Sequence, residues 1–566
     1  MPLRPLLLLL LLTGCTTAAR AELRLLASAT SDSYQSLTFG LSSFCQAAGF
    51  PFALTEINGT ASEFLLIPNL AGIDVQQRIW LLWLAAGPQD QPEADIVSVA
   101  ILPTADNAAA ALQALTNSYP VVRAEEGQFL FWRYARPPAE PASASGKSVA
   151  PVLYVAVRRG TVIVSASREA AFWAASHALP SVPAAASAVA GQVRFEFQPA
   201  VLAALLAAEG GDRTESQSRL RNIAAQVMTD IRALTLAVET TTEGVTARLS
   251  VSPRPDSRLA RLFARIHPPE KSFWQMCPDP ATLAMTSGGA GIWQIPGTYE
   301  ASRTNLPPTA ETVLGDCLTG DSAVFIDRMA ATNGPLFYAE ILGITNRAVA
   351  WARAQSAPQA LLPFTTSFRF VTNGTRTVLG TPVLDLTRHG FVASADGNRN
   401  PADMAAFMVR DGGISLAVTG SCLVMTFGVP GAMEQVLQQL ASLPAKPSLP
   451  ARCRKLLPDL PDAPCSAVLL QPAGLIRQIA LSLPGLKPER VAALPLPGDG
   501  MAAATTRDAD NVLHLTLRAS ANEISRLQDG MTKGQAALQE MFMQMALQQM
   551  LQMDRKLDAP DPRDPR

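Results

Sequence analysis

The chain carries the same succession of local patterns twice, and this recurrence constrains its fold more than any other feature. The motif Gln-Pro-Ala at residues 198–200 lies between a strand-like and a helix-like run, and it returns at residues 471–473. Further pairs of segments match in the same order and with nearly constant spacing: 155–165 with 416–426, 245–249 with 513–517, and 257–259 with 525–527. Solenoid repeats are far shorter than this spacing, so the pattern predicts a tandem duplication of one folded unit.

Within each copy, strand-like runs are interleaved with helix-like runs. Residues 234–239 and 245–251 alternate apolar and polar side chains, which is typical of antiparallel strands with one face in water. The apolar run at residues 79–84 is too short to cross a bilayer, so we interpret it as a strand buried on both faces. We therefore predict an α+β protein: a tandem duplication of a mixed, mainly antiparallel sheet-plus-helix unit, followed by a C-terminal helix. Two unrelated α+β regions with commonplace patterns are the alternative.

These patterns divide the 566 residues into consecutive segments. The predicted organisation is a signal peptide over 1–21, module A1 over 23–180, module B1 over 190–267, module A2 over 270–445, module B2 over 463–530, a Met-rich C-terminal helix over 531–557, and a disordered tail over 558–566. The tail is polar and contains repeated Asp-Pro pairs, a composition that disfavours a packed core.

The N-terminal residues indicate export. One basic residue, Arg4, precedes an unbroken leucine run at 6–12, and small residues follow, as in a secretory signal. Two processing sites remain open: residues 12–15 resemble a bacterial lipobox, in which Cys15 would carry lipid, and residues 19–21 resemble an ordinary signal-peptidase site. Either route predicts an extracytoplasmic protein, which would be periplasmic, anchored in the outer membrane through lipid on Cys15, or secreted.

The cysteines fit an oxidising compartment. Of the seven cysteines, six follow Cys15, and an even number in an exported chain permits disulfides. Cys453 and Cys465 flank a Pro-rich loop, so they are the pair that we expect to be bonded, with buried free thiols as the alternative. The absence of a Cys-x-x-Cys motif argues against a thioredoxin-type site and against a Cys-rich zinc site.

Motifs for catalysis and for cofactors are weak in this sequence. The formal net charge of −1 provides no field that would attract nucleic acid, so no nucleic-acid partner is expected. The four histidines are dispersed and form no pair at a spacing that suits a metal ion, and no Gly-x-Ser-x-Gly elbow occurs. His514 alternates with leucines in a strand-like run. We therefore predict no catalytic, cofactor-binding or metal-binding residue.

The C-terminal helix is the one segment whose pattern suggests a protein partner. Its apolar surface includes Met541, Phe542, Met545 and Met550, and deformable thioether surfaces are common where helices dock. These four residues are candidates for partner binding or self-association, and packing on module B2 is the alternative. Copper binding is disfavoured because residues two apart on a helix point in nearly opposite directions.

Together these features favour an exported bacterial envelope protein with a non-enzymatic binding or scaffolding role. One alternative is a hydrolase that acts on an envelope polymer, with its acidic residues on distant loops. A second is a carrier of an apolar ligand.

Overall fold

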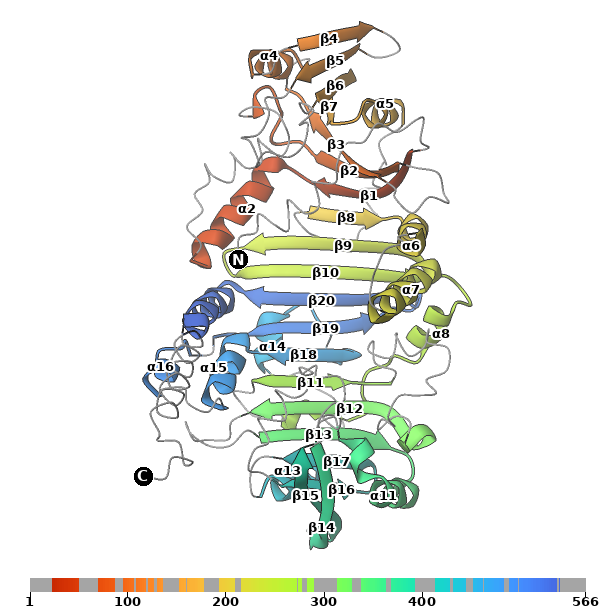
Figure 1. The fold of residues 1–566 in the computed structure, drawn as a ribbon, viewed down its shortest axis with the longest axis vertical. Helices are drawn as coiled ribbons and strands as arrows, with labels where there is room; N and C mark the ends of the chain where they lie inside the picture. Colours follow the sequence, from red (N-terminus) through yellow and green to blue (C-terminus); the bar gives the residue numbers. More distant parts are fainter. Residues whose placement is uncertain are drawn as a thin grey trace, which may run out of the picture. The chain divides into compact units, whose positions relative to one another are not determined.

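The computed structural model describes the greater part of the chain, and its strands form one large antiparallel sheet accompanied by helices (Figure 1). The predicted mixture of helices and mainly antiparallel strands is confirmed. The described residues are 23–49, 70–86, 95–105, 108–118, 121–126, 130–135, 152–158, 160–177, 193–208, 215–271, 273–276, 282–289, 313–327, 337–362, 368–391, 413–427, 431–443, 451–461, 463–482, 488–496, 498–536 and 539.

The chain divides into two compact units. Unit 1 comprises Met1–Arg265, Ile292–Ser302 and Thr506–Leu517. Unit 2 comprises Ile266–Gly291, Arg303–Thr505 and Arg518–Arg566. The bounds of the units fall within β19 (Met501–Arg507) and β20 (Leu513–Ser520).

Unit 1 alternates strands with helices along the chain. Its strands are β1 (Leu23–Ser31), β2 (Ile79–Ala86), β3 (Asp95–Pro103), β4 (Val121–Glu126), β5 (Leu130–Ala135), β6 (Val152–Arg158), β7 (Thr161–Ser165), β8 (Val193–Phe197), β9 (Ile231–Thr241) and β10 (Gly244–Pro253). Its helices are α2 (Tyr34–Ala47), α4 (Ala109–Ser118), α5 (Arg168–Ser176), α6 (Pro199–Ala208), α7 (Glu215–Asp230) and α8 (Arg258–Ala264). The strands pair antiparallel in the order β4–β5–β6–β7–β3–β2–β1–β8–β9–β10.

Unit 2 also combines strands with helices. Its strands are β11 (Leu283–Ser287), β12 (Leu318–Asp327), β13 (Phe337–Ile344), β14 (Phe368–Val378), β15 (Thr381–Phe391), β16 (Ile414–Val418), β17 (Cys422–Phe427) and β18 (Ser466–Leu470), followed by β19. Its helices are η2 (Phe273–Met276), η4 (Gly315–Cys317), α11 (Arg347–Ser356), η5 (Pro358–Leu361), α13 (Ala432–Ala441), α14 (Ala451–Leu456), α15 (Pro472–Ser482), α16 (Pro488–Ala492) and a last helix over residues 521–536. The strands pair antiparallel in the order β14–β15–β16–β17–β13–β12–β11–β18–β19.

Serine side chains fix the start of several helices in unit 1. Ser33, Ser167 and Ser257 precede α2, α5 and α8, and each hydroxyl accepts a hydrogen bond from the backbone N–H three residues later. These caps satisfy N–H groups that have no partner inside the helix, and they typically contribute about 1 kcal/mol each.

The part of the unit 1 sheet formed by β1, β8, β9 and β10 has one apolar and one polar face. Ala27 and Ala29 of β1 and Phe195 and Phe197 of β8 form the apolar face, against which α6 packs. Because side chains alternate along a strand, the intervening residues lie on the opposite face. That face carries hydroxyl and charged side chains, including Arg194, Glu196, Thr235, Arg248 and Ser250.

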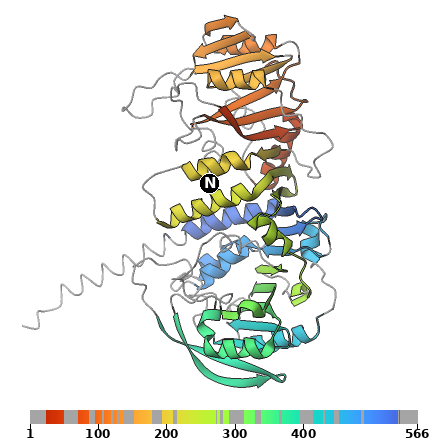
Figure 2. The ribbon, with the colours of Figure 1, turned by 90° about the vertical axis from the view of Figure 1, so that its right-hand side faces the viewer.

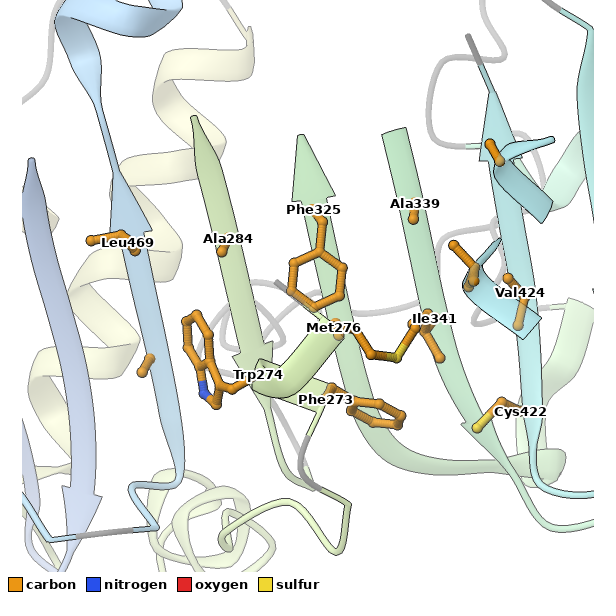
Figure 3. Close-up of a cluster of buried hydrophobic side chains, with 14 of the residues drawn as sticks. Phe273, Trp274, Met276, Ala284, Phe325, Ala339, Ile341, Cys422, Val424 and Leu469 are labelled. Carbon is orange, nitrogen blue, oxygen red and sulfur yellow. The ribbon is translucent and has the colours of Figure 1, made fainter. Parts of the chain in front are cut away.

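The central strands of the unit 2 sheet are covered on both faces. On one face, Phe273, Trp274 and Met276 of the short helix η2 lie over Phe325 of β12 and Ile341 of β13 (Figure 3). On the other face, α11 packs on a second cluster of buried residues from β13, β15, β16 and β17. Burial on both faces makes this sheet the main source of hydrophobic stabilisation in unit 2.

Candidate functional site

The residues singled out from the sequence are placed only in part. Cys453 lies in α14 and Cys465 directly before β18, and both are buried. A disulfide between them stays a prediction. Cys15 and the four residues of the C-terminal helix, Met541, Phe542, Met545 and Met550, lie outside the described residues.

The feature best suited to binding is the open edge of β14 in unit 2. This strand is 11 residues long and, among the described strands, pairs only with β15. All side chains from residue 371 to residue 377 are exposed, so both faces of this part of the strand are in contact with water. Figure 2 shows the hairpin as two long green strands. An exposed strand edge of this length offers a row of backbone groups for pairing with another strand.

The hairpin turn determines which backbone groups of β14 face outward. Leu379 and Gly380 form the two-residue turn with φ of 49° and 76°, the combination that a type I′ hairpin requires. In this hairpin Val378 and Thr381 form the closing hydrogen-bonded pair, so the next pair, Thr377 and Pro382, is not hydrogen-bonded. Pro382 has no N–H, which fits this position.

It follows that the N–H and C=O groups of Thr377 point away from β15. Antiparallel ladders alternate, so those of Thr375 point outward as well, whereas Arg376 is hydrogen-bonded to Val383. The open edge thus presents two donors and two acceptors at residues 375 and 377. The pairing becomes irregular between Thr372 and Gly374, which limits the regular part of this edge to the end near the turn.

The one charged side chain in the exposed stretch 371–377 is turned toward carboxylates of its own unit. The Arg376 guanidinium lies 2.8 Å from the Asp385 carboxylate and also pairs with Glu434 at the start of α13. The hydrogen bond from Arg376 holds the pKa of Glu434 below its ordinary value, and the same bond raises the pKa of Arg376. The outward-facing backbone groups of the edge therefore belong to two residues with neutral side chains, Thr375 and Thr377.

The strand at the end of the pairing order in unit 1, β4, is different. β4 is six residues long and pairs, among the described strands, only with β5. It contains Arg123, Glu125 and Glu126, and charged residues on a short strand disfavour pairing with another chain. Three of the six residues of β4 are charged, compared with two of the 11 residues of β14. Sequence reasoning missed the β14 edge, although Gly380 between two runs of threonine and valine is a hairpin signal.

Lys271, Asp321, Ser421 and Cys422 form a polar cluster at one end of the unit 2 sheet. The Lys271 ammonium donates to the Ser421 hydroxyl, and its Nζ lies 3.8 Å from the Sγ of Cys422. Burial raises the pKa of the Cys422 thiol, although Lys271 acts in the opposite direction. Asp321, which is also buried, accepts a hydrogen bond of 3.0 Å from the Glu270 N–H. A protonated, buried thiol is a poor nucleophile, so this cluster anchors the segment 266–271 and offers little reactivity.

A carboxyl group also lies within the second core cluster of unit 2. Glu340 on β13 accepts a hydrogen bond of 2.8 Å from the Tyr338 hydroxyl, and the Tyr338 ring stacks on Phe427. Burial raises the pKa of Glu340 above its ordinary value, and the hydrogen bond from Tyr338 offsets this only in part. The folded state therefore holds the Glu340 proton more tightly than the unfolded state does.

This difference predicts a specific dependence of stability on pH. The contribution of Glu340 is fully present below its unfolded pKa and is lost as the pH rises through the raised folded pKa, with a slope of at most about 1.4 kcal/mol per pH unit. We expect Glu340→Gln, which keeps an acceptor for Tyr338, to remove this loss in urea titrations at pH 4–8. Glu434→Gln is the control with the opposite sign, since the pKa of Glu434 is lowered. Parallel curves for wild type and Glu340→Gln would contradict the expectation.

The described residues give no indication of a metal centre or a membrane-spanning helix. Among them, no group of three or more His, Cys, Asp or Glu side chains is arranged to hold a metal ion. Within the same part of the chain, none of the helices combines the length and the apolar character needed to cross a bilayer. Comparison of the chain with protein-family models, with curated proteins and with solved structures found no match.

Proposed function

We propose that this chain is an exported envelope protein with a scaffolding role, and that two copies associate by strand addition along the β14 edge. The leucine run at 6–12 supports export. The observation that carries the binding role is the pair of threonines, Thr375 and Thr377, whose backbone groups face outward on a long strand and whose own side chains are neutral. Fractionation of cells tests the export, with the protein expected outside the cytoplasm.

We further propose that the scaffold arose by tandem duplication of one unit. The pairing order of unit 1 becomes that of unit 2 when ten is added to each strand number, and strands 1 to 9 all have such a counterpart. Unrelated sheets of this size would rarely share every pairing. The longer and less charged β14 then marks a feature in which the second copy differs from the first.

Backbone hydrogen bonds outside the ladders support the same correspondence. The bond from Gln198 N to Leu26 O in unit 1 is matched by the bond from Gln471 N to Thr282 O in unit 2. The bond from Thr104 N to Gly160 O is matched by that from Ile344 N to Ser421 O. The bond from Ala105 N to Gly72 O is matched by that from Thr345 N to Cys317 O. Two residues before Gly72 and before Cys317, Leu70 and Gly315 have positive φ values of 52° and 50°. A positive φ is uncommon for leucine, so its occurrence at the position equivalent to Gly315 is informative.

A second copy of the chain fits the open edge better than a charged partner does. Around a two-fold axis, Thr375 of one copy would pair with Thr377 of the other, and every outward donor would meet an acceptor. Such an interface is the same patch on both copies, so a neutral edge meets a neutral edge. The charge of each Arg376 is balanced by Asp385 and Glu434 of its own copy, which lowers the repulsion across the axis.

We expect Thr377→Pro to weaken this association. Proline removes the outward N–H of residue 377 and leaves the β14–β15 hydrogen bonds intact, because the pair with Pro382 is not hydrogen-bonded. Each dimer would lose two hydrogen bonds, about 1–3 kcal/mol in total, which corresponds to a roughly 10–100-fold higher dissociation constant. Sedimentation velocity over a range of concentrations of the full chain measures this constant.

Thr377→Val is the matched control, since it changes the side chain and keeps the N–H. The proposal requires that the valine variant dimerise like wild type. A wild-type chain that stays monomeric at every concentration, or a proline variant that dimerises equally well, would refute it.

A further inference from the structure

A chain of hydrogen bonds on the polar face of unit 1 joins a serine, a histidine and an aspartate. The Ser250 Oγ lies 2.9 Å from the His514 Nδ1. The His514 Nε2 lies 3.3 Å from the Asp508 Oδ2. All three residues belong to unit 1 and lie outside the β14 edge. A nucleophile within hydrogen-bond reach of a base, with the base oriented by a third group, is the structural signature of nucleophilic catalysis.

The fold brings these residues together from distant parts of the sequence. Ser250 lies on β10, His514 lies on β20, and these two strands pair. Leu513 is buried, so the alternation of the strand places His514 on the polar face with Ser250. Asp508 precedes β20 and is held by the Val512 N–H, which donates to its Oδ1 at 2.8 Å. The backbone therefore holds one carboxylate oxygen of Asp508, and the other oxygen faces the imidazole of His514.

We propose that Ser250 is the nucleophile of an acyl-transfer site that hydrolyses carboxylic esters. His514 Nδ1 takes the Ser250 hydroxyl proton as Oγ bonds to the ester carbonyl carbon. When the tetrahedral intermediate collapses, the bond to the leaving oxygen breaks and the imidazole returns the proton to it, which releases an alcohol. Water then attacks the acyl group with the same base, the acid leaves, and Ser250 regains its proton. Asp508 is a positioning residue, because it keeps the other imidazole proton on Nε2.

The surroundings suit a small ester with a negative charge. About a third of the His514 side chain is exposed (34%), so a substrate can reach the imidazole from solvent. Thr235 lies directly across from Ser250 on β9, so a second hydroxyl group lies on the same face beside the nucleophile. Arg232 donates to the Ser252 hydroxyl, two residues along from Ser250, and so brings a positive charge beside the site. A carboxylate or phosphate on the substrate would pair with that charge.

A fluorophosphonate probe on the full-length purified protein tests this site. The serine oxygen displaces fluoride from phosphorus, and mass spectrometry locates the label. We expect the label on Ser250 and not on Ser252, which is an internal control on the same strand face. His514→Gln should slow labelling at least about 100-fold, the usual contribution of a general base. With 4-nitrophenyl esters, the wild type should hydrolyse the succinate monoester faster than the acetate, and Ser250→Ala should abolish both activities.

Two results would overturn the inference. One is a folded wild-type chain in which Ser250 is not labelled, since the Ser250–His514–Asp508 hydrogen bonds would then only stabilise the pairing of β10 with β20. The other is a His514→Gln variant, folded by circular dichroism, that labels at the wild-type rate. If that variant does not fold, Asp508→Asn takes its place, and unchanged labelling there is equally contradictory. None of these outcomes depends on the association through β14.

Discussion

Replacement of Glu523 by alanine is expected to lower the free energy of unfolding of unit 2 by about 3–5 kcal/mol. Glu523 lies in the helix over residues 521–536, and its side chain is completely buried. Its Oε1 accepts a hydrogen bond of 3.1 Å from the Ala473 N–H, and its Oε2 accepts bonds of 2.9 Å from Gly498 and 3.3 Å from Gly500. Alanine would leave three backbone donors without this acceptor in a site that water does not reach.

Urea unfolding followed by circular dichroism measures the effect. Glu489→Ala, at an exposed site in α16 of the same unit, is the control and should change the free energy by less than about 0.5 kcal/mol. Glu523→Gln should fall between the two, because it keeps an oxygen acceptor and adds an N–H₂ group that faces other donors. A loss below about 1 kcal/mol in the alanine variant would show that the three amides find other partners.

Replacement of Gly288 by alanine is expected to cost about 3 kcal/mol, at the upper end for an added methyl group. A Cβ at this position would lie 2.2 Å from the His267 carbonyl oxygen, 2.4 Å from the Pro269 nitrogen and 2.6 Å from the Pro268 carbonyl carbon. All three are backbone atoms, so no side-chain rotation relieves the clash. The segment that ends at Lys271 would have to move off the end of β11, which would disturb the Lys271–Ser421 contact as well.

Gly420→Ala provides a matched control for this change. A Cβ at Gly420 meets nothing within 4 Å, and the site is also in unit 2. Calorimetry should therefore show a lower unfolding temperature for Gly288→Ala and almost none of this decrease for Gly420→Ala. Equal unfolding temperatures for the two variants would mean that the segment 267–269 can move away at little cost in free energy.

Much of the local structure could be predicted because it depends on neighbouring residues. The apolar run at 79–84 forms part of β2 and is buried on both faces, as expected: Leu82 and Leu84 face one core cluster, and Ile79 faces another. The Gln-Pro-Ala motifs lie at the junction between a strand and a helix in both places, at the start of α6 and of α15. Proline favours the first turn of a helix, which explains why this signal is visible in the sequence alone.

The two proposed sites could not be predicted, because they depend on which strands become neighbours. β14 has an open edge because, among the described strands, only β15 pairs with it, and no pattern within residues 368–378 reveals that. In the same way, Ser250 and His514 meet only because β10 pairs with β20. The alternation with leucines predicts that His514 is a strand residue, but nothing in the sequence indicates that Ser250 lies beside it.

Hydrogen exchange of single amides in β14 tests the central claim, that this edge joins two copies of the chain, most directly. The claim predicts that the amides of Thr375 and Thr377 exchange quickly in dilute protein and become protected as the concentration rises. The amide of Arg376, which is already bonded to β15, should be equally protected at all concentrations. Exchange at Thr375 and Thr377 that does not change with concentration would contradict the claim.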